Sequence, residues 1–514
     1  MLVKTYSSTV FGINATTITI EVNLGLGINF YLVGLPDNAV KESQQRIKAA
    51  FKNNELKFPG REITVNMAPA DIRKEGSVFD LPIAIGILAV SEQVKTDVLS
   101  EYLLIGELSL DGSIQATKGI LPIALQAKKE GFKGIIVPQQ NAQEAAVVNG
   151  LEVYGAEKLT DVVAFLNQEE NHLQKAEMDV MQQFEQLIDH FDVDFKDVKG
   201  QLNIKRAFEI AAAGGHNVIL IGPPGAGKSM LAKRLSTILP PMSLDEALET
   251  TKIHSVAGKV KGEVGLITQR PFRKPHHTIS DIGLIGGGSY PQPGEISLAH
   301  NGVLFLDELP EYKRQVLEVM RQPLEDRVVN ISRAKFSIDY PAGFMLVAAM
   351  NPCPCGYFNH PEKECVCGPG VVQRYLNKIS GPLMDRIDLH VEVTPVSFDE
   401  LSTDVPQEGS KEIRQRVEKA RNLQKERYAK RQGIHCNAHM SKNEFDQFCK
   451  LDETGNRILK NAMDKMGLSA RAYDRILKVA RTIADLDASE NILSQHIAEA
   501  IQYRSLDKNN WNLN

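Results

Sequence analysis

Hydrophobic and polar positions alternate along the opening stretch of the chain. Residues 16–24 (TTITIEVNL) place apolar side chains at every second position, which predicts a half-buried β-strand. Residues 38–55 have the spacing of a helix, and residues 61–69 (REITVNMAP) return to strand-like alternation. The mixture continues through the helical pattern ILPIALQAKKEGF and the strand-like GIIVP. We therefore predict an α/β domain over residues 1–166.

A second α/β block is predicted over residues 200–394. Its strand-like runs are VILIG, GVLFLDE and FMLVAAMN, and helical or loop-rich stretches separate them. From residue 411 to about residue 505 the pattern is helical throughout, so an all-helical C-terminal domain is predicted over 411–514. Residues 167–199 are acidic and residues 395–410 are polar with two prolines, so both segments are expected to be linkers.

Composition agrees with a folded chain of several domains. A length of 514 residues corresponds to about three domains at roughly 150 residues each. The net charge of −5 excludes a uniformly basic protein, but it conceals local differences. Residues 169–197 carry a net charge of −7, whereas residues 411–431 carry +6. A near-neutral total therefore does not exclude nucleic acid as a partner.

Cysteine content and apolar runs indicate the compartment. Six cysteines are too few for a disulfide scaffold, and the N-terminus lacks the pattern of a signal peptide. The longest apolar run, Leu81 to Val90, has ten residues, which cannot cross about 30 Å of hydrocarbon as a helix. We expect a cytoplasmic protein without a membrane partner, in which clustered cysteines indicate metal or redox sites.

A complete G-x-x-x-x-G-K-S motif lies between the strand-like VILI and the helical SMLAKRLSTIL. Backbone N–H groups of such a loop surround phosphates, and the helix that follows favours anions. The lysine supplies a cation to the phosphates and the serine hydroxyl can bind Mg²⁺. The predicted ATP-binding residues are Gly222, Pro223, Pro224, Gly225, Ala226, Gly227, Lys228 and Ser229.

Polar residues end the next two predicted strands. Asp307 and Glu308 follow an apolar run, and carboxylates at this edge of an α/β sheet fit a magnesium ligand and a base that activates water. Asn351 ends the third strand and can orient the attacking water. Farther on, Arg386 lies between two acids, where a local ion pair is the simple alternative, and Arg471 begins an amphipathic helical pattern.

This order of motifs resembles an AAA+ ATPase of the magnesium-chelatase-like clade. The flanking sequences, among them RPFRKPHHTISDIGLIGGGS, RQPLEDRVVNISRA and MNPCPCGY, resemble the ComM/YifB group over essentially the whole chain. The resemblance implies that Asn351 is sensor 1, Arg386 the arginine finger of a neighbouring subunit and Arg471 sensor 2. It also implies a homohexamer that uses ATP and Mg²⁺.

The function implied by the resemblance is that of a helicase promoting branch migration during homologous recombination in natural transformation. Its partners would be single- and double-stranded DNA and recombination proteins. Two alternatives stay open from the sequence. One is a magnesium-chelatase-type ATPase subunit, and the other is an ATP-dependent protein remodeller or protease.

The N-terminal domain resembles the protease domain of Lon. Alignment on GELSLDG and KEGFK places Val78 at the position of the nucleophilic serine and Leu121 at that of the lysine. Neither side chain can act as nucleophile or base, so peptidase activity is not expected. Ser77 and Lys118 are the nearest residues of the required types, and both need a shift in register.

Four cysteines follow Asn351 closely: Cys353, Cys355, Cys365 and Cys367. Four thiolates within fifteen residues suit tetrahedral Zn²⁺, although the usual spacing is C-x₂-C rather than C-x-C. A Gly/Pro-rich loop with free thiols is the alternative, and His360 is a substitute ligand. Cys436 and Cys449 have no partner pattern.

Basic residues suggest three surfaces for DNA. The first is the helical segment 411–431, for which a solvated helix face is the alternative. The other two are loops that fit a ring pore, with subunit packing as the alternative. One loop holds Arg270, Arg273, Lys274, His276 and His277 and leads to Gly286, Gly287 and Gly288. The other holds Arg333 and Lys335 in a strand-like segment that fits a hairpin.

Overall fold

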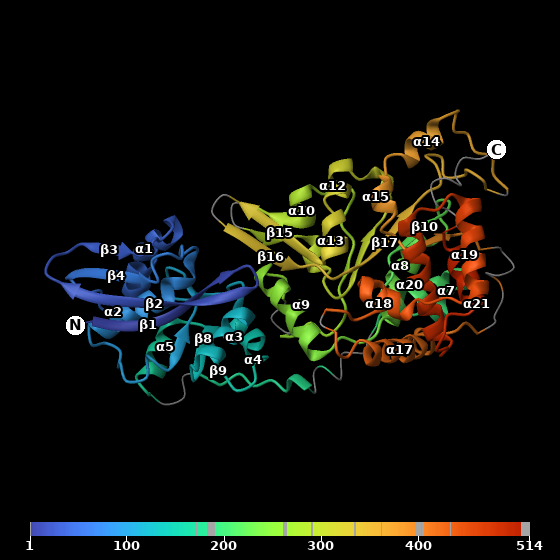
Figure 1. Ribbon diagram of the computed structural model, residues 1–514. Coiled ribbons are helices and arrows are strands. Elements are labelled where there is room, and N and C mark those ends of the chain that lie inside the picture. Colours follow the sequence, from blue (N-terminus) through green and yellow to red (C-terminus); the bar gives the residue numbers. More distant parts are fainter. Residues whose placement is uncertain are drawn as a thin grey trace. The chain divides into compact units, whose positions relative to one another are not determined.

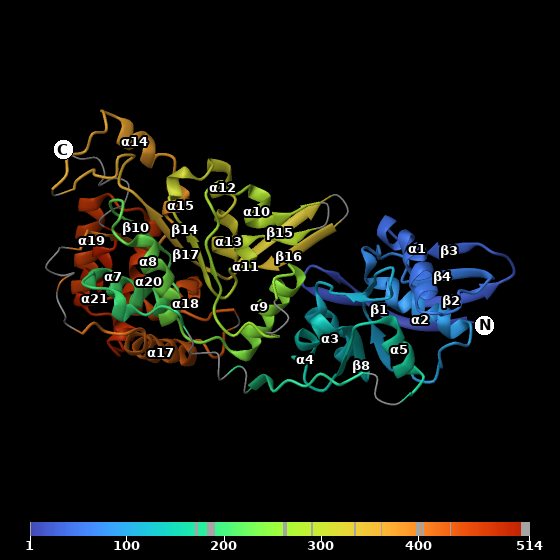
Figure 2. The ribbon, with the colours of Figure 1, turned by 180° about the vertical axis from the view of Figure 1, so that it is seen from behind.

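The computed structural model describes residues 2–169, 173–181, 184, 191–260, 265–288, 291–333, 336–360, 362–396, 402, 406–431 and 433–504. The chain forms two compact units (Figures 1 and 2). The first comprises Met1–Ile188, Ser243–Thr268 and Ala334–Tyr340, and the second comprises Asp189–Met242, Gln269–Arg333 and Pro341–Asn514. Among the described residues, no helix combines the length and apolar composition needed to cross a bilayer.

A seven-stranded mixed sheet forms the centre of the first unit, in the order β3-β4-β2-β1-β5-β8-β9. Strand β2 (Asn14–Gly25) pairs antiparallel with β1 (Leu2–Phe11) and with β4 (Glu62–Ala68). Ile18, Ile20 and Val22 of β2 are fully buried, as the alternation predicts. The remaining strands are β3 (Phe30–Val33), β5 (Tyr102–Leu104), β8 (Gly134–Pro138) and β9 (Glu152–Ala156).

The long apolar run of the sequence forms the central helix of this unit. Every residue of α2 (Asp80–Val90) is buried, so the run packs into the interior of the unit. The other helices and short strands are α1 (Asn38–Asn53), β6 (Glu107–Leu108), β7 (Ile114–Gln115), α3 (Ile120–Glu130), α4 (Ala142–Ala146) and α5 (Leu159–Leu166).

Helix α9 (Leu244–Val256) belongs to the first unit although it interrupts the sequence of the second. The Ser255 hydroxyl donates to the buried carboxylate of Glu144, and the Gly119 N–H donates to the Ser255 carbonyl at 3.1 Å. These contacts attach α9 to the segments that begin α3 and α4. The continuous block predicted over residues 200–394 does not show this excursion.

A five-stranded parallel sheet forms the centre of the second unit, in the order β11-β14-β17-β10-β18. Its strands β10, β14 and β17 are buried at every residue, as expected for a parallel sheet covered on both faces. Because all strands run in the same direction, their carboxyl ends meet at one edge. The strands are β10 (Val218–Ile221), β11 (Phe272–Arg273), β14 (Val303–Leu306), β17 (Met345–Met350) and β18 (Leu389–Glu392).

The C-terminal helices share one hydrophobic core with this sheet. Val347 of the sheet, Val417 of α17 and Ile483 of α20 belong to the same buried cluster. Figures 1 and 2 show these orange and red helices beside α7 and α8. The helices concerned are α7 (Leu202–Gly214), α8 (Lys228–Ile238), α17 (Ser410–Arg427), α18 (Lys442–Phe448), α19 (Glu453–Met466), α20 (Ala470–Leu486) and α21 (Ser494–Gln502).

Shorter elements connect the strands of the second sheet. They are α10 (Asp281–Ile285), β12 (Gly286–Gly287), β13 (Gln292–Pro293), α11 (Glu295–Leu298), α12 (Arg314–Glu318), α13 (Arg321–Asp326), β15 (Val328–Arg333), α14 (Val371–Leu376) and α15 (Gly381–Met384). Strand β16 (Phe336–Pro341) follows β15 in the chain.

The described end of the acidic segment is packed rather than solvated, which differs from the predicted linker. Phe195 is fully buried, and Asp194 accepts a hydrogen bond from the Ser410 N–H at 2.9 Å. The Arg234 guanidinium lies 3.0 Å from Asp197 and lowers the pKa of that carboxyl. The charge pattern predicts exposure, but it does not reveal these partners, which lie far away in the sequence.

A buried ion pair links α1 to α2 and gives a test of the fold. Arg46 donates to both carboxylate oxygens of Asp80 at 2.6 and 2.9 Å, and Asp80 is 1% exposed. Arg46→Met leaves that carboxylate buried without its cation, so we expect a loss of about 3–5 kcal/mol in the free energy of unfolding. Denaturant unfolding of the full chain measures it.

Arg73→Met is the matched control for this measurement. Arg73 pairs with Glu75 at 3.0 Å, but its side chain is 65% exposed, so we expect a loss below about 1 kcal/mol. Equal losses for the two variants would contradict the assigned role of burial.

Candidate nucleotide site

The phosphate loop lies where the sequence predicts it, between β10 and α8. Gly225 and Gly227 have φ angles of 80° and 81°, the left-handed region that glycine adopts without strain. A Cβ on Gly222 would lie 2.2 Å from the Val393 carbonyl oxygen, so only glycine fits there. The loop conformation therefore favours glycine at both glycine positions of the motif, 222 and 227, and also at position 225 between them.

Lys228 is held inside this loop by three oxygen atoms. Its Nζ donates to the carbonyls of Gly222 and Pro223 at 2.7 and 2.8 Å and to Asn351 Oδ1 at 3.1 Å. Burial lowers the pKa of Lys228, and the carboxylate of Asp307 acts in the opposite direction. Asn351, which ends β17, thus contacts the phosphate-binding lysine directly.

Ser229 and Asp307 lie together at the carboxyl edge of the sheet. The Ser229 hydroxyl donates to Asp307 Oδ2 at 2.6 Å. Two oxygens bound side by side to octahedral Mg²⁺ lie about 2.9 Å apart, since Mg–O bonds are about 2.1 Å. The serine and the aspartate therefore fit a shared magnesium ion, as the sequence predicts.

Lys274 is a neighbour of the same carboxylate, and the sequence analysis did not place it here. Its Nζ lies 2.9 Å from Asp307 Oδ2. Burial raises the pKa of Asp307, but hydrogen bonds from Ser229 and Lys274 outweigh it, and the pKa is below its ordinary value. The carboxylate is therefore charged at neutral pH, as a magnesium ligand must be.

The backbone turns at Glu308, shortly after the end of β14, so this residue leaves the strand at the nucleotide site. Its φ of 53° lies in the left-handed region, and its side chain is 59% exposed. His277 Nδ1 lies 3.2 Å from Glu308 Oε2, so this histidine is also a member of the site. No signal in the sequence marks Lys274 and His277 as members of the site, because they follow β11, a strand of two residues that pairs with β14.

Several basic residues of the first loop proposed for a ring pore make contacts within the second unit. Arg273 donates to both carboxylate oxygens of Glu295 at 2.6 and 2.7 Å. Arg270 donates to the carbonyls of Pro240 and Asn301. Lys274 and His277 lie beside the acids of β14. These contacts favour the packing alternative for the cations of this loop.

All three residues of the glycine triplet adopt positive φ angles, which other residue types rarely adopt. Gly286, Gly287 and Gly288 have φ angles of 109°, 136° and 103°. The first two pair as β12 with β13. In the second loop, Arg333 ends β15, but its side chain and the whole of Lys335 lie outside the described residues. The DNA role of these five positions stays a prediction.

Arg386 and Arg471 have partners other than the phosphate loop in the described structure. Arg386 is 7% exposed, pairs with Glu325 at 2.5 Å and donates to the Pro382 carbonyl. Arg471 is exposed and pairs with Asp385 at 3.3 Å. The local ion pair considered for Arg386 involved its sequence neighbours, and the actual partner is Glu325. The finger and sensor roles of both arginines stay predictions.

Asp388 joins the sheet to the C-terminal helices. It is 1% exposed and accepts from Arg475 of α20 at 2.9 Å and from the Asn217 N–H at 2.9 Å. Burial raises its pKa, but Arg475 and His216 outweigh this effect and hold the pKa of Asp388 below its ordinary range. A charged carboxylate thus links α20 to the residue that precedes β10.

The four predicted metal ligands are brought together by the structure. The sulfur atoms of Cys353, Cys355, Cys365 and Cys367 all lie within 4.8 Å of one another. His360 does not join them, because its Nδ1 accepts hydrogen bonds from two backbone N–H groups at 3.1 Å. The thiols therefore form a group of their own.

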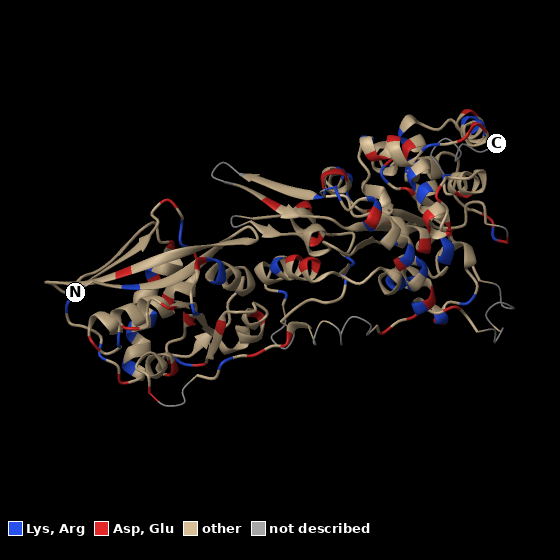
Figure 3. Ribbon diagram, turned by 60° about the horizontal axis from the view of Figure 1, so that its bottom comes forward, with Lys and Arg blue, Asp and Glu red and all other residues tan. Residues whose placement is uncertain are grey.

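Most arginines of segment 411–431 are engaged in packing. Arg427 pairs with buried Asp485, Arg416 with Glu209 and Glu408, and Arg421 donates to the Ala212 carbonyl. Figure 3 shows Lys and Arg interspersed with Asp and Glu over the helices of the second unit. The exposed cations of α17 and its C-terminal extension are Lys411, Lys419, Lys425, Lys430 and Arg431, of which Arg431 pairs with Glu444 at 3.3 Å.

The protease-like positions of the first unit lack a nucleophile and base in contact. Leu121 is fully buried and Val78 is partly buried among apolar side chains. The Ser77 hydroxyl donates to Glu107, whereas Lys118 is exposed. The absence of peptidase activity stays a prediction.

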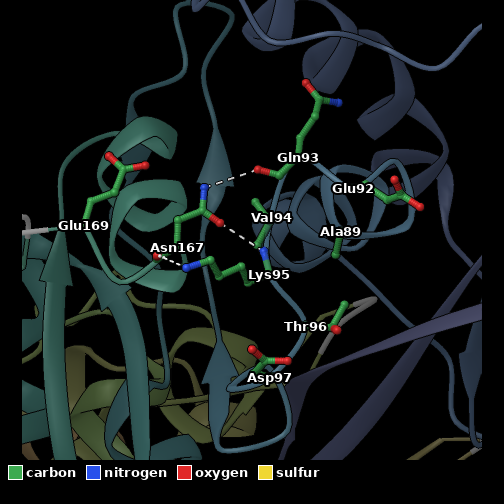
Figure 4. A pocket seen from close by; sticks show the side chains of 9 residues that line it. All are labelled: Ala89, Glu92, Gln93, Val94, Lys95, Thr96, Asp97, Asn167 and Glu169. Atoms are coloured by element: carbon green, nitrogen blue, oxygen red, sulfur yellow. Dashed lines mark hydrogen bonds between the residues drawn. The ribbon is translucent and has the colours of Figure 1, made fainter.

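The first unit also contains a polar hollow of about 640 Å³. Lys95 donates through its backbone N–H to Asn167 Oδ1 and through Nζ to the Asn167 carbonyl, both at 3.0 Å (Figure 4). No residue singled out from the sequence lines the hollow.

Comparison with known proteins agrees with this geometry. The family model "Magnesium chelatase, subunit ChlI" matches residues 194–401, and models of the ChlI subunit and its C-terminal part match residues 20–141 and 407–504. The competence protein ComM of Haemophilus influenzae is 46% identical over 505 residues, which cover 98% of this chain and 97% of that protein. The chain belongs to the ComM/YifB family.

Other relatives agree with this membership. YifB of Escherichia coli is 45% identical over 499 residues, covering 97% of this chain and 96% of that protein. Lon protease 2 of Bacillus subtilis is 29% identical over 189 residues, or 31% of this chain. The family is one of magnesium-chelatase-like AAA+ ATPases, and this class implies ATP and Mg²⁺ as cofactors.

Two substitutions separate binding from hydrolysis at this site. Glu308→Gln removes the base but leaves the phosphate loop intact, so we expect kcat for ATP to fall by about 10²–10⁴ while the Kd for ATP stays within a few-fold. Lys228→Met should instead weaken ATP binding. Steady-state hydrolysis and binding of a fluorescent ATP analogue distinguish them. Equal loss of binding in both variants would contradict the assigned roles.

His277 gives a further test, because its Nδ1 lies 3.2 Å from one oxygen of Glu308 and would compete with the attacking water for that oxygen. His277→Ala should free the carboxylate and raise the basal kcat several-fold with an unchanged KM for ATP. His277→Asn keeps a donor at the position of Nδ1 and should restore the basal rate. His276→Ala is the control, since His276 Nδ1 contacts Thr278 at 2.9 Å. An unchanged rate in His277→Ala would refute the restraint.

Proposed function

We propose that this chain is an ATP-driven DNA motor, a helicase that promotes branch migration during homologous recombination in natural transformation. It acts in the cytoplasm as a homohexamer on single- and double-stranded DNA together with recombination proteins. Its cofactors are ATP, Mg²⁺ and Zn²⁺. The observation that carries the proposal is the complete ATP site in a chain that is 46% identical to a competence protein.

Each residue of the site has a separate role in the proposed hydrolysis of ATP. The phosphate loop and Lys228 bind the phosphates and balance their charge, while Ser229 and Asp307 hold Mg²⁺. The ion supplies positive charge to the developing phosphate. Glu308 takes the proton of the attacking water, and Asn351 orients that water from the end of β17. Arg386 would reach the site of a neighbouring subunit after leaving Glu325.

DNA would be bound by backbone-directed contacts. The glycine triplet at residues 286–288 would permit close approach of a phosphate backbone, and Arg333 and Lys335 would add positive charge. The four exposed lysines of segment 411–431 are further candidates. Such contacts need no base specificity, which suits a motor that moves along DNA.

A second candidate follows from the family models, which carry the name of magnesium chelatase. In that case the ATPase would act with partner subunits on a porphyrin. A protein remodeller is the third class, and the absence of a nucleophile at Val78 disfavours a protease.

One assay separates these classes. ATP hydrolysis is measured with single-stranded DNA, forked DNA, protoporphyrin and unfolded protein, and branch migration is followed on a synthetic four-way junction. We expect stimulation by DNA and junction movement that Glu308→Gln abolishes. Stimulation by protoporphyrin or unfolded protein without stimulation by DNA would refute the proposal.

DNA contact by the second loop has its own test. Arg333→Ala with Lys335→Ala should weaken DNA binding and reduce the slope of log Kd against log salt by about one to two, because two phosphate contacts are lost. Basal ATP hydrolysis should survive. An unchanged DNA affinity and salt slope would contradict this role.

A further inference from the structure

Three of the four clustered sulfur atoms are closer than ordinary unbonded thiols. Cys353 Sγ lies 3.2 Å from Cys355 Sγ and 3.7 Å from Cys365 Sγ, and Cys355 Sγ lies 3.5 Å from Cys365 Sγ. All four cysteines are free thiols, and these distances far exceed the roughly 2.05 Å of a disulfide bond.

The arrangement matches a tetrahedral thiolate site. With Zn–S bonds of about 2.3 Å, neighbouring sulfurs of a tetrahedron lie about 3.8 Å apart. The three distances of 3.2, 3.7 and 3.5 Å are shorter than that value by about 0.1–0.6 Å, so small movements of the sulfur atoms would enclose an ion. Four soft thiolates select zinc over the oxygen-seeking Mg²⁺ of the nucleotide site.

The loop that carries the first two thiols contacts the nucleotide site at both of its ends. At one end, Asn351 Oδ1 accepts from Lys228 Nζ at 3.1 Å. At the other end, Gly356 has a φ of 86°, and a Cβ there would lie 2.4 Å from Cδ of Pro224 in the phosphate loop. The Gly356 N–H donates to the Cys353 carbonyl at 3.0 Å and closes the turn between these contacts.

We infer that Cys353, Cys355, Cys365 and Cys367 bind one Zn²⁺, and that this ion braces the phosphate loop through Gly356 and Asn351. The ion joins residues 353–355 to residues 365–367 and so fixes the turn that touches Pro224. Zinc binding and ATP binding are then coupled, and the coupling acts equally in both directions. The inference rests on the nucleotide site of the proposed function but not on DNA as its partner.

Zinc content and ATP affinity of the full chain test the inference. Protein purified without chelator should contain about one zinc per chain by elemental analysis. Removal of zinc should raise the Kd for ATP by about 5–150-fold, the usual range of coupling, and re-added zinc should restore it. Conversely, saturating ATP should slow the transfer of zinc to a colorimetric chelator.

Two variants distinguish the loss of zinc from the loss of the contact between Gly356 and the phosphate loop. Cys365→Ser with Cys367→Ser should lose both zinc and tight ATP binding. Gly356→Ala leaves all four thiols in place but collides with Pro224, so it should keep zinc and still weaken ATP binding. Cys449→Ala, at a buried cysteine outside the cluster, is the control and should keep both.

Two results would overturn the inference. Less than a tenth of an equivalent of zinc, with no uptake of added zinc or Co²⁺, would refute the metal site. An ATP affinity that is the same with and without zinc, and the same in Gly356→Ala, would refute the brace. Neither measurement depends on DNA, so a failure of the proposed DNA function gives a different pattern.

Discussion

A buried ammonium group constrains the nucleotide-binding unit. Lys228 lies away from water and needs oxygen partners, because an unpaired charge in such surroundings costs several kcal/mol. Two partners come from its own loop, and the third is Asn351 at the end of β17. The lysine therefore ties the phosphate loop to the neighbouring strand. The strand order serves this requirement, because β17 lies between β10 and β14 and brings the asparagine, the lysine and the acids to one edge.

The parts of this site that are local in sequence could be predicted. The strand, loop and helix around the phosphate motif are contiguous, and Asp307 and Asn351 each end an apolar run that is long enough to be recognised. The contacts of Lys274 and His277 could not be predicted, because they depend on β11, a strand of two residues that pairs with β14. The cysteine cluster is an intermediate case, since its members are near one another in sequence but only the fold shows their sulfur distances.

Of the sequence properties, local net charge said the least about which residues are exposed and which are paired inside a unit. The sequence of segment 411–431 predicts a basic helix, yet most of its arginines bind acids and carbonyl groups of the same unit, and four of its five exposed cations are lysines. The guanidinium group explains this division, because its planar donors suit buried pairs such as Arg427 with Asp485. The sequence likewise did not show that α9 packs with the first unit, since the bond from Ser255 to Glu144 joins residues 111 positions apart.

The carboxylate of Asp388 has a consequence for how the C-terminal helices can move. It holds Arg475 of α20 and the backbone just before β10 at the same time, inside the unit. A gradual tilt of α20 would draw Arg475 away from the carboxylate of Asp388, which is 1% exposed and would lose its cation before water could replace it. The helix is therefore expected to take one of two positions, engaged or released. Movement of the C-terminal helices would then be abrupt rather than graded.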